Sequence, residues 1–189
     1  MENKRLAVLF PGIGYHCDKP LLYYSARLAR AAGYAVLPVN YSGFPEKVRG
    51  DEEKLRASLQ IAHEQARALL APVRWGEWTE IVFIGKSIGT VAAGMYAAEE
   101  GLTVRSILLT PLEETFRRAR GEAIAFHGTA DPWADNDAVA SACREAGIPL
   151  YLTEGANHSL ETGDIRRDLK TLAETMERIE RFIVPPTEA

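Results

Sequence analysis

The sequence has 189 residues, of which 47% are hydrophobic and 25% charged, a balance typical of a single domain with a substantial core. The formal net charge of −4 gives no electrostatic reason to expect a nucleic-acid partner. The start, Met1 to Arg5, does not resemble a signal peptide, and no apolar run reaches the roughly 18 residues that cross a membrane. We therefore expect a cytoplasmic protein that does not bind membranes. Cys17 and Cys143 lack metal-ligand spacing, which predicts reduced thiols and no metal site.

Predicted strands and helices alternate along the whole chain. The hydrophobic patterns predict strands at residues 6–10, 34–39, 80–86, 104–110, 123–127 and 148–152, and helices at 21–32, 51–70, 88–95, 135–146 and 165–182. Pro38 places the second strand at a sheet edge, because proline cannot donate a ladder hydrogen bond. Alternation of this kind predicts an α/β fold in which a mostly parallel, doubly wound, six-stranded sheet carries helices on both faces.

The predicted elements form one domain over residues 1–184. Pro185 and Pro186 end the pattern, so residues 185–189 are expected to be a flexible tail. The segment 111–122 is short and charged. About a dozen residues cannot form a domain with its own core, so we expect no cap domain above the sheet.

The most informative stretch is Gly85-Lys86-Ser87-Ile88-Gly89, which follows the third strand directly. The run Ile81 to Ile84 has no polar alternation, as in a strand buried on both faces. The small residues after Gly89 predict a helix, so Ser87 sits where strand becomes helix. A turn this sharp strains its central residue and leaves no room for side chains beside it, which explains both glycines.

Two other glycine motifs fit the sequence less well. A phosphate-binding P-loop ending in Gly85-Lys86-Ser87 needs a glycine five residues before Gly85, where the chain has Glu80. A dinucleotide fingerprint beginning at Gly12-Ile13-Gly14 lacks its third glycine, because that position is Cys17. Nucleotide hydrolysis is therefore disfavoured, and a dinucleotide site is a weak alternative.

The strand, the G-x-S-x-G turn and the helix resemble the nucleophile elbow of the α/β-hydrolase superfamily, in particular its small uncapped serine hydrolases. This resemblance implies strand order 2-1-3-4-5-6. It also implies a catalytic triad in the chain order Ser, Asp, His. His127-Gly128-x-x-Asp131-Pro132 after the fifth strand and Gly155-x-x-His158 after the sixth resemble the acid and histidine loops of the family.

The roles implied by the resemblance are Ser87 as nucleophile, His158 as general base and then acid, and Asp131 as the residue that orients His158. Asp135 and Asp137 are rival acids, but they fall in a predicted helix and are displaced from the strand end. His127, at the end of a strand, is expected to be packed rather than catalytic.

The oxyanion hole implied by the family consists of two backbone N–H groups. One belongs to Ile88, and the other to Ile13 in Pro11-Gly12-Ile13-Gly14, where family members often have histidine instead of Pro11. Lys86 is expected to pack its stem while its amine reaches water, although a bias toward acidic substrates is also open. Residues that could line the pocket are Gly12, Gly14, Tyr15, His16, Asp18, Lys86 and Trp133.

The sequence thus predicts a carboxylesterase-like serine hydrolase that acts on a small ester or thioester and needs no metal or organic cofactor. Thioesterase and acyltransferase activities remain open, since the fold does not choose among them. The alternative is a hydrolase-like binding or interaction protein without turnover. Either a monomer or a homodimer is compatible with the sequence.

Overall fold

The computed structural model describes residues 4–117 and 121–184. The strands are β1 (Arg5–Phe10), β2 (Tyr34–Pro38), β3 (Glu80–Lys86), β4 (Arg105–Leu109), β5 (Ala123–Gly128) and β6 (Leu150–Thr153). The helices are α1 (Pro20–Ala31), α2 (Glu52–Leu70), η1 (Trp75–Glu77), α3 (Ile88–Glu99), α4 (Glu113–Phe116), α5 (Asn136–Ala146) and α6 (Ile165–Ile183). The tail predicted at 185–189 lies outside the described residues.

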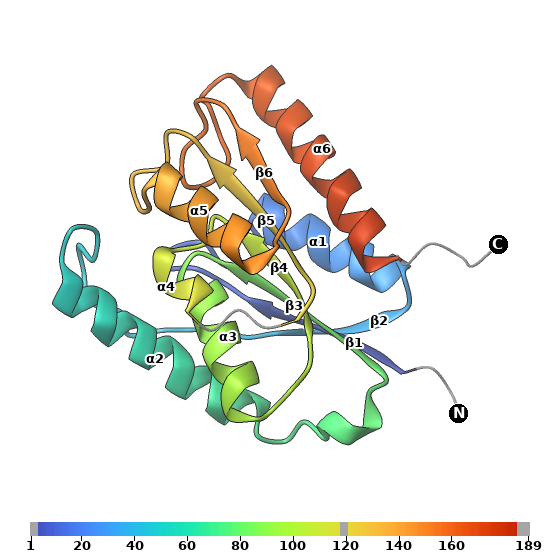
Figure 1. Ribbon diagram of the computed structural model, residues 1–189. Coiled ribbons are helices and arrows are strands. Elements are labelled where there is room, and N and C mark those ends of the chain that lie inside the picture. Colours follow the sequence, from blue (N-terminus) through green and yellow to red (C-terminus); the bar gives the residue numbers. More distant parts are fainter. Residues whose placement is uncertain (1–3, 118–120, 185–189) are drawn as a thin grey trace.

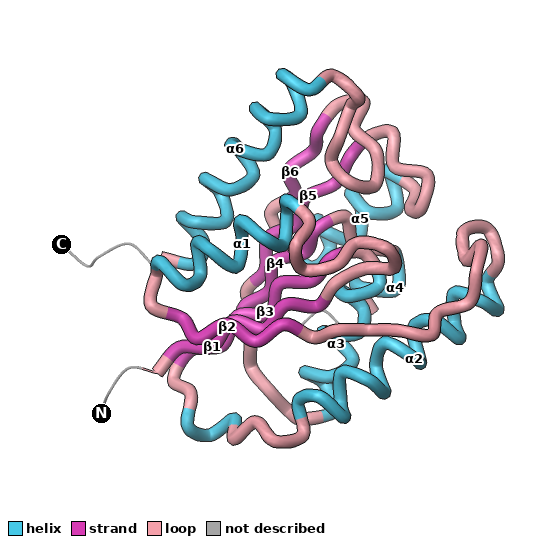
Figure 2. The backbone as a smooth tube through the Cα atoms, turned by 180° about the vertical axis from the view of Figure 1, so that it is seen from behind, coloured by secondary structure: helices cyan, strands magenta, loops and turns pink. Residues whose placement is uncertain are grey.

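The six strands form one sheet in the order β2-β1-β3-β4-β5-β6, and every neighbouring pair is parallel. The predicted fold class and strand order are therefore confirmed. Pro38 ends the edge strand β2, where its missing N–H leaves no gap in the ladder. Figure 2 shows the sheet from behind, with β5 and β6 turned relative to β1 and β2 by the usual strand twist.

Helices cover both faces of the sheet. α1 and α6 pack on one face, and α2, α3 and α5 lie on the other (Figure 1). The apolar run of β3 explains its central position, since Val82, Phe83 and Ile84 are all buried and alternate between the two faces. Both cysteines, Cys17 and Cys143, are unpaired thiols, as expected.

Aspartate side chains fix the starts of three helices. Asp51 caps α2, Asp135 caps α5 and Asp164 caps α6, each by accepting a hydrogen bond from a backbone N–H of the first turn. Asp135 accepts from the Ala138 N–H, and the carboxylate that contacts the His158 imidazole is Asp131 and not Asp135. These caps therefore determine at which residue each of the three helices begins.

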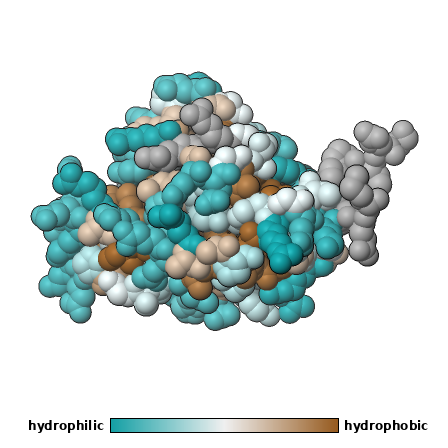
Figure 3. Space-filling view, turned by 90° about the horizontal axis from the view of Figure 1, so that it is seen from below, coloured by the Kyte–Doolittle hydropathy of each residue, from teal (hydrophilic) through white to brown (hydrophobic). Residues whose placement is uncertain are grey.

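On the face of the molecule seen from below, hydrophobic residues lie interspersed among hydrophilic ones (Figure 3). Of the helices in residues 4–117 and 121–184, none combines the length and the hydrophobicity needed to span a bilayer.

Candidate active site

Ser87 lies at a sharp turn between β3 and α3. Its backbone has φ 56° and ψ −125°, a left-handed conformation that costs a residue with a side chain about 1–3 kcal/mol. The turn is held because the Ser87 N–H donates to the Leu109 carbonyl at 3.0 Å, and the Thr90 N–H and hydroxyl both donate to the Ser87 carbonyl. The strained geometry expected from the G-x-S-x-G motif is present.

The two glycines of the motif are required by close backbone contacts. A Cβ on Gly85 would lie 2.7 Å from the Cα of Thr90, and one on Gly89 would lie 2.0 Å from the Phe10 carbonyl oxygen. The start of α3 can approach the end of β1 only because Gly89 has no side chain. These contacts bring the α3 N-terminus beside the loop that follows β1.

We predict that Gly89→Ala lowers the free energy of unfolding by about 2–4 kcal/mol, because backbone atoms of β1 must move to admit the new methyl group. Gly76→Ala is the matched control: nothing lies within 4 Å of a Cβ there, and its effect should stay within about 0.5 kcal/mol. Urea unfolding of both variants measures the difference. Equal free energies of unfolding for Gly89→Ala and Gly76→Ala would contradict the close contact between α3 and β1.

Ser87, His158 and Asp131 form a continuous chain of hydrogen bonds. The distance from Ser87 Oγ to His158 Nε2 is 2.7 Å, and the distance from His158 Nδ1 to Asp131 Oδ2 is also 2.7 Å. A carboxylate can only accept, so Nδ1–H donates to Asp131 and Nε2 is left to accept the Ser87 hydroxyl proton. The structure thus brings the three predicted side chains together from loops far apart in the sequence.

Burial and hydrogen bonding set the proton affinities of this group. Burial alone would raise the pKa of Asp131, but the hydrogen bonds from His158 and from the Trp133 N–H outweigh it and keep that pKa below its ordinary value. The pKa of His158 is lowered by burial, with a further lowering from the nearby charge of Lys86, which together outweigh the hydrogen bond to Asp131. At neutral pH the arrangement is therefore a carboxylate, a neutral imidazole and a hydroxyl.

The loops that carry Asp131 and His158 are joined by short backbone contacts. Gly128 ends β5, and a Cβ there would lie 2.3 Å from the Ala156 carbonyl oxygen. The same oxygen accepts from the Ala130 N–H at 2.9 Å. Asn157 shapes the other side, where its Oδ1 accepts from the Ser159 N–H at 2.7 Å. Sequence reasoning missed the roles of Gly128 and Asn157, although a loop Asn before His158 is a known turn signal.

We predicted that Trp133 lines the pocket, and the structure places it in direct contact with His158 and Asp131. Its ring stacks on the His158 imidazole, with ring centres 5.3 Å apart and planes inclined by 23°. Its backbone N–H also donates to Asp131 Oδ1. One residue therefore restrains both partners of Ser87, and an aromatic face lies against the ring that can become positively charged.

One predicted oxyanion donor, Ile88, follows Ser87 directly in the chain, and the other, Ile13, follows Gly12, where an added Cβ would lie 3.2 Å from Ser87 Cβ. Ile88 is the first residue of α3, where helix N–H groups have no partner within the helix. Ile13 lies in the turn after β1, closed by hydrogen bonds between Gly12 and Tyr15, and Gly14 in that turn has φ 66°. Neither the Ile13 nor the Ile88 N–H donates to another residue of the described ranges. Both N–H groups therefore remain without a protein partner within residues 4–117 and 121–184.

The other residues considered from the sequence lie in different environments. His16 is 64% exposed and lies 3.6 Å from Asp18, which is 92% exposed, and within the described residues neither forms a hydrogen bond or ion pair with Ser87, His158 or Asp131. His127 is packed as expected, with its Nε2 2.9 Å from Asn136 Oδ1. The prediction that the amine of Lys86 reaches water is wrong: the residue is only 1% exposed, because the turn after β1 closes over it.

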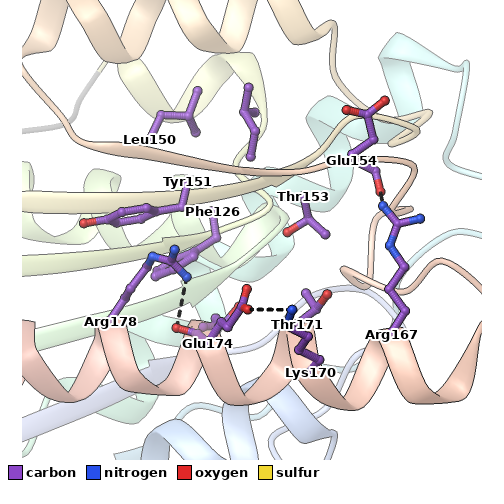
Figure 4. Close-up of a pocket in the computed structure, with 12 residues that line it drawn as sticks. Phe126, Leu150, Tyr151, Thr153, Glu154, Arg167, Lys170, Thr171, Glu174 and Arg178 are labelled. Carbon is purple, nitrogen blue, oxygen red and sulfur yellow. Dashed lines mark hydrogen bonds and ion pairs between the residues drawn. The ribbon is translucent and has the colours of Figure 1, made fainter.

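A groove of about 390 Å³ lies elsewhere, between β6 and α6 (Figure 4). Its cationic groups already have partners: Arg167 donates to the Glu154 carbonyl, Lys170 pairs with Glu174, and Arg178 lies over the Tyr151 ring. None of the predicted site residues lines this groove. The candidate site is therefore the one centred on Ser87.

Comparisons with known proteins agree with this architecture. No protein-family profile and no curated protein matches the chain, but many solved structures do. Est1E from Butyrivibrio proteoclasticus has 15% identity and a TM-score of 0.68, with 97% of this chain and 90% of that one covered. An alpha-beta serine hydrolase homologue from Coxiella burnetii has 17% identity and a TM-score of 0.66, covering 97% and 86%.

A third similar structure is an α/β serine hydrolase without a lid from Xanthomonas campestris, with 18% identity and a TM-score of 0.61, covering 97% of this chain and 84% of that one. Identities this low establish the fold alone. The chain has the α/β-hydrolase fold. A short α4 stands where a cap domain would be inserted, between β4 and β5.

Proposed function

We propose that the protein is a serine hydrolase that cleaves a carboxylic ester or thioester through an acyl-enzyme. The observation that carries this proposal is the hydrogen-bonded chain from Ser87 through His158 to Asp131, with both links at 2.7 Å. A serine hydroxyl is a poor nucleophile until a positioned base takes its proton. Here the base is in place, and a buried carboxylate fixes its tautomer.

The reaction follows from this geometry in two halves. Ser87 Oγ attacks the carbonyl carbon while its proton passes to His158 Nε2, and the carbonyl oxygen becomes an anion held by the Ile13 and Ile88 N–H groups. The bond to the alcohol or thiol then breaks, and His158 returns the proton to that leaving group. Water attacks the acyl-enzyme by the same route, which releases the acid and restores Ser87. Every step uses groups that this chain supplies.

The similar structures support hydrolysis as the class of reaction, since two are described as serine hydrolases. One structure of Est1E contains ferulic acid. The fold hosts many chemistries, so the substrate must be argued from this chain's own surface.

A groove of about 300 Å³ starts at the loop directly after His158. It runs between the start of α1 and the start of α6, and its apolar lining includes Tyr15, Leu21, Leu160, Ile165, Leu169 and Leu172. Ile165 and Leu169 are unusually exposed, at 69% and 60%. We propose that this groove holds the apolar acyl or alcohol part of the substrate, since burying those two side chains against a hydrocarbon would be favourable.

Hydrolysis of a matched series of esters and thioesters, from acetyl to decanoyl, tests this proposal. The expected result is turnover with a preference for medium chains, and Leu169→Glu should lower kcat/KM for octanoyl substrates by about 10-fold while leaving acetyl substrates unchanged. Leu152→Glu is the control, because Leu152 is similarly exposed, at 54%, but lies outside the groove. Equal rates on all chain lengths, or equal effects of the two variants, would contradict the assignment of the groove.

A further inference from the structure

Lys86 is the most unusual residue near the site. It is the last residue of β3, directly before Ser87, and its whole side chain is buried. Lysine is among the residues that are almost never fully buried without a partner. Yet within residues 4–117 and 121–184 the Lys86 amine takes part in no hydrogen bond or ion pair; it contacts the Tyr15 ring, and the carboxylate that acts on its charge is Asp131. A buried amine without such a partner is costly, so its position calls for a role.

What covers Lys86 is the turn that carries Ile13. The turn runs from Gly12 to Tyr15 and is closed at both ends: the Gly12 N–H donates to the Tyr15 carbonyl at 3.1 Å, and the Tyr15 N–H donates to the Gly12 carbonyl at 3.3 Å. Gly12 lies on the stem of Lys86, because a Cβ there would be 3.6 Å from Lys86 Cγ and 3.2 Å from the Lys86 carbonyl oxygen. One end of the turn therefore rests on the nucleophile strand itself.

The other end of the turn rests on the amine of Lys86. Lys86 Nζ lies 4.9 Å from the centre of the Tyr15 ring, within the range of a cation–π contact. Tyr15 is itself fixed, since its hydroxyl accepts a hydrogen bond from the Leu21 N–H of α1 at 3.1 Å. Lys86 thus contacts both residues that close the turn, and Ile13 lies between them.

We propose that Lys86 and Tyr15 form a clamp that holds the turn 12–15 against the nucleophile elbow and so fixes the Ile13 N–H relative to Ser87 and the Ile88 N–H. Lys86 is then a positioning residue for oxyanion stabilisation. This inference rests on the proposed hydrolase function. Oxyanion donors are effective because they are already in place when charge develops on the substrate oxygen, and a short surface turn needs an anchor to meet that requirement.

A double-mutant cycle on kcat at pH 6.5, where the Lys86 amine carries its charge, tests the clamp. Lys86→Met keeps an unbranched stem of similar length and removes the charge, Tyr15→Leu removes the aromatic face, and Tyr15→Phe keeps that face. With an acetyl ester, which is too short to fill the groove that Tyr15 lines, we expect Lys86→Met and Tyr15→Leu each to lower kcat by about 10-fold with KM unchanged. Tyr15→Phe keeps the aromatic face but loses the hydrogen bond from the Leu21 N–H, so its loss of kcat should be clearly smaller than that of Tyr15→Leu. The double variant Lys86→Met/Tyr15→Leu should be no slower than either single variant, because both remove the same contact.

Amide hydrogen exchange provides a measurement that needs no substrate. The protected amides of Gly12 and Tyr15 should exchange about 10-fold faster in Lys86→Met than in the wild type, because the turn opens more often. Multiplicative losses of kcat in the double variant, or unchanged exchange at these two amides, would overturn the clamp. Faster exchange in a protein that hydrolyses no ester or thioester would support the clamp and contradict the proposed hydrolase function instead.

Discussion

Ser87→Ala should reduce kcat for any ester or thioester substrate by about 10⁴-fold or more, while KM changes little. The variant lacks the oxygen that forms the covalent bond, and His158 Nε2 loses the hydroxyl now 2.7 Å away. His158→Ala should cause a loss of similar size, since the serine would keep its proton. Residues that act as one unit do not contribute additively, so the double variant should be no worse than either single variant.

Ser141→Ala is the matched control for the loss of a serine hydroxyl. Ser141 lies on α5, where its hydroxyl donates to Glu145, and its removal should leave kcat unchanged. Folding of all variants is checked by thermal melting. A Ser87→Ala protein that is folded and keeps more than a few per cent of the wild-type rate would exclude Ser87 as the nucleophile and favour a different reaction at this site.

Lys86→Met should make the protein more stable, and by an amount that depends on pH. Burial lowers the pKa of Lys86 to about 7 from its ordinary value of 10.5, with only a partial offset from the charge of Asp131. The groups that face the amine are the Tyr15 phenol, the Asp131 carboxylate and the His158 imidazole. Between pH 7 and 10.5 the unfolded chain therefore keeps a proton that the folded protein releases, and wild-type stability rises with pH.

Burying the ammonium lowers the free energy of unfolding of the wild type by its full amount below pH 7 and by almost nothing near pH 10.5. A buried methionine has no such penalty. Lys86→Met should thus raise the free energy of unfolding by about 3–5 kcal/mol at pH 6 and by much less at pH 9.5. Urea unfolding at several pH values measures the difference. Lys170→Met, at a 77% exposed lysine, should change stability by no more than about 0.5 kcal/mol at every pH. A stability gain that does not vary with pH would contradict the buried charge.

The two predictions about Lys86 point in opposite directions, which makes them informative together. The same substitution is expected to stabilise the fold and to slow the reaction. Natural proteins commonly tolerate such a loss of stability where a strained or costly group serves function. Ser87, held at a positive φ, is a second costly residue in the same turn.

Much of this arrangement could be predicted from the sequence because it depends on patterns local to the chain. The apolar run of β3, the flanking Gly85 and Gly89, and the alternation of strands with helices predict the elbow and the parallel sheet. The strand order followed from the family resemblance, and the structure confirms it. Parallel strands then bring their carboxyl ends to one edge, where Ser87, Asp131 and His158 meet.

The rest depends on contacts between loops that lie far apart in the sequence. Nothing in the residues around Lys86 indicates that a turn 71 residues earlier, at Tyr15, would close over its amine. The stacking of Trp133 on His158 and the contact of Gly128 with Ala156 arise in the same way. Sequence periodicity reports which face of an element is buried, but it does not report which loop covers the end of a strand.

The most direct measurement for the central claim is the reaction of the purified protein with a fluorophosphonate probe, followed by mass spectrometry to locate the adduct. An activated serine displaces fluoride from the probe and forms a covalent bond to phosphorus. The account predicts a single adduct on Ser87, lost in Ser87→Ala and at least about 10³-fold slower in His158→Ala. No adduct on the folded wild-type protein would contradict this prediction and favour a binding protein that retains the fold without turnover, and labelling of Ser87 that does not need His158 would contradict the role of His158 as the base.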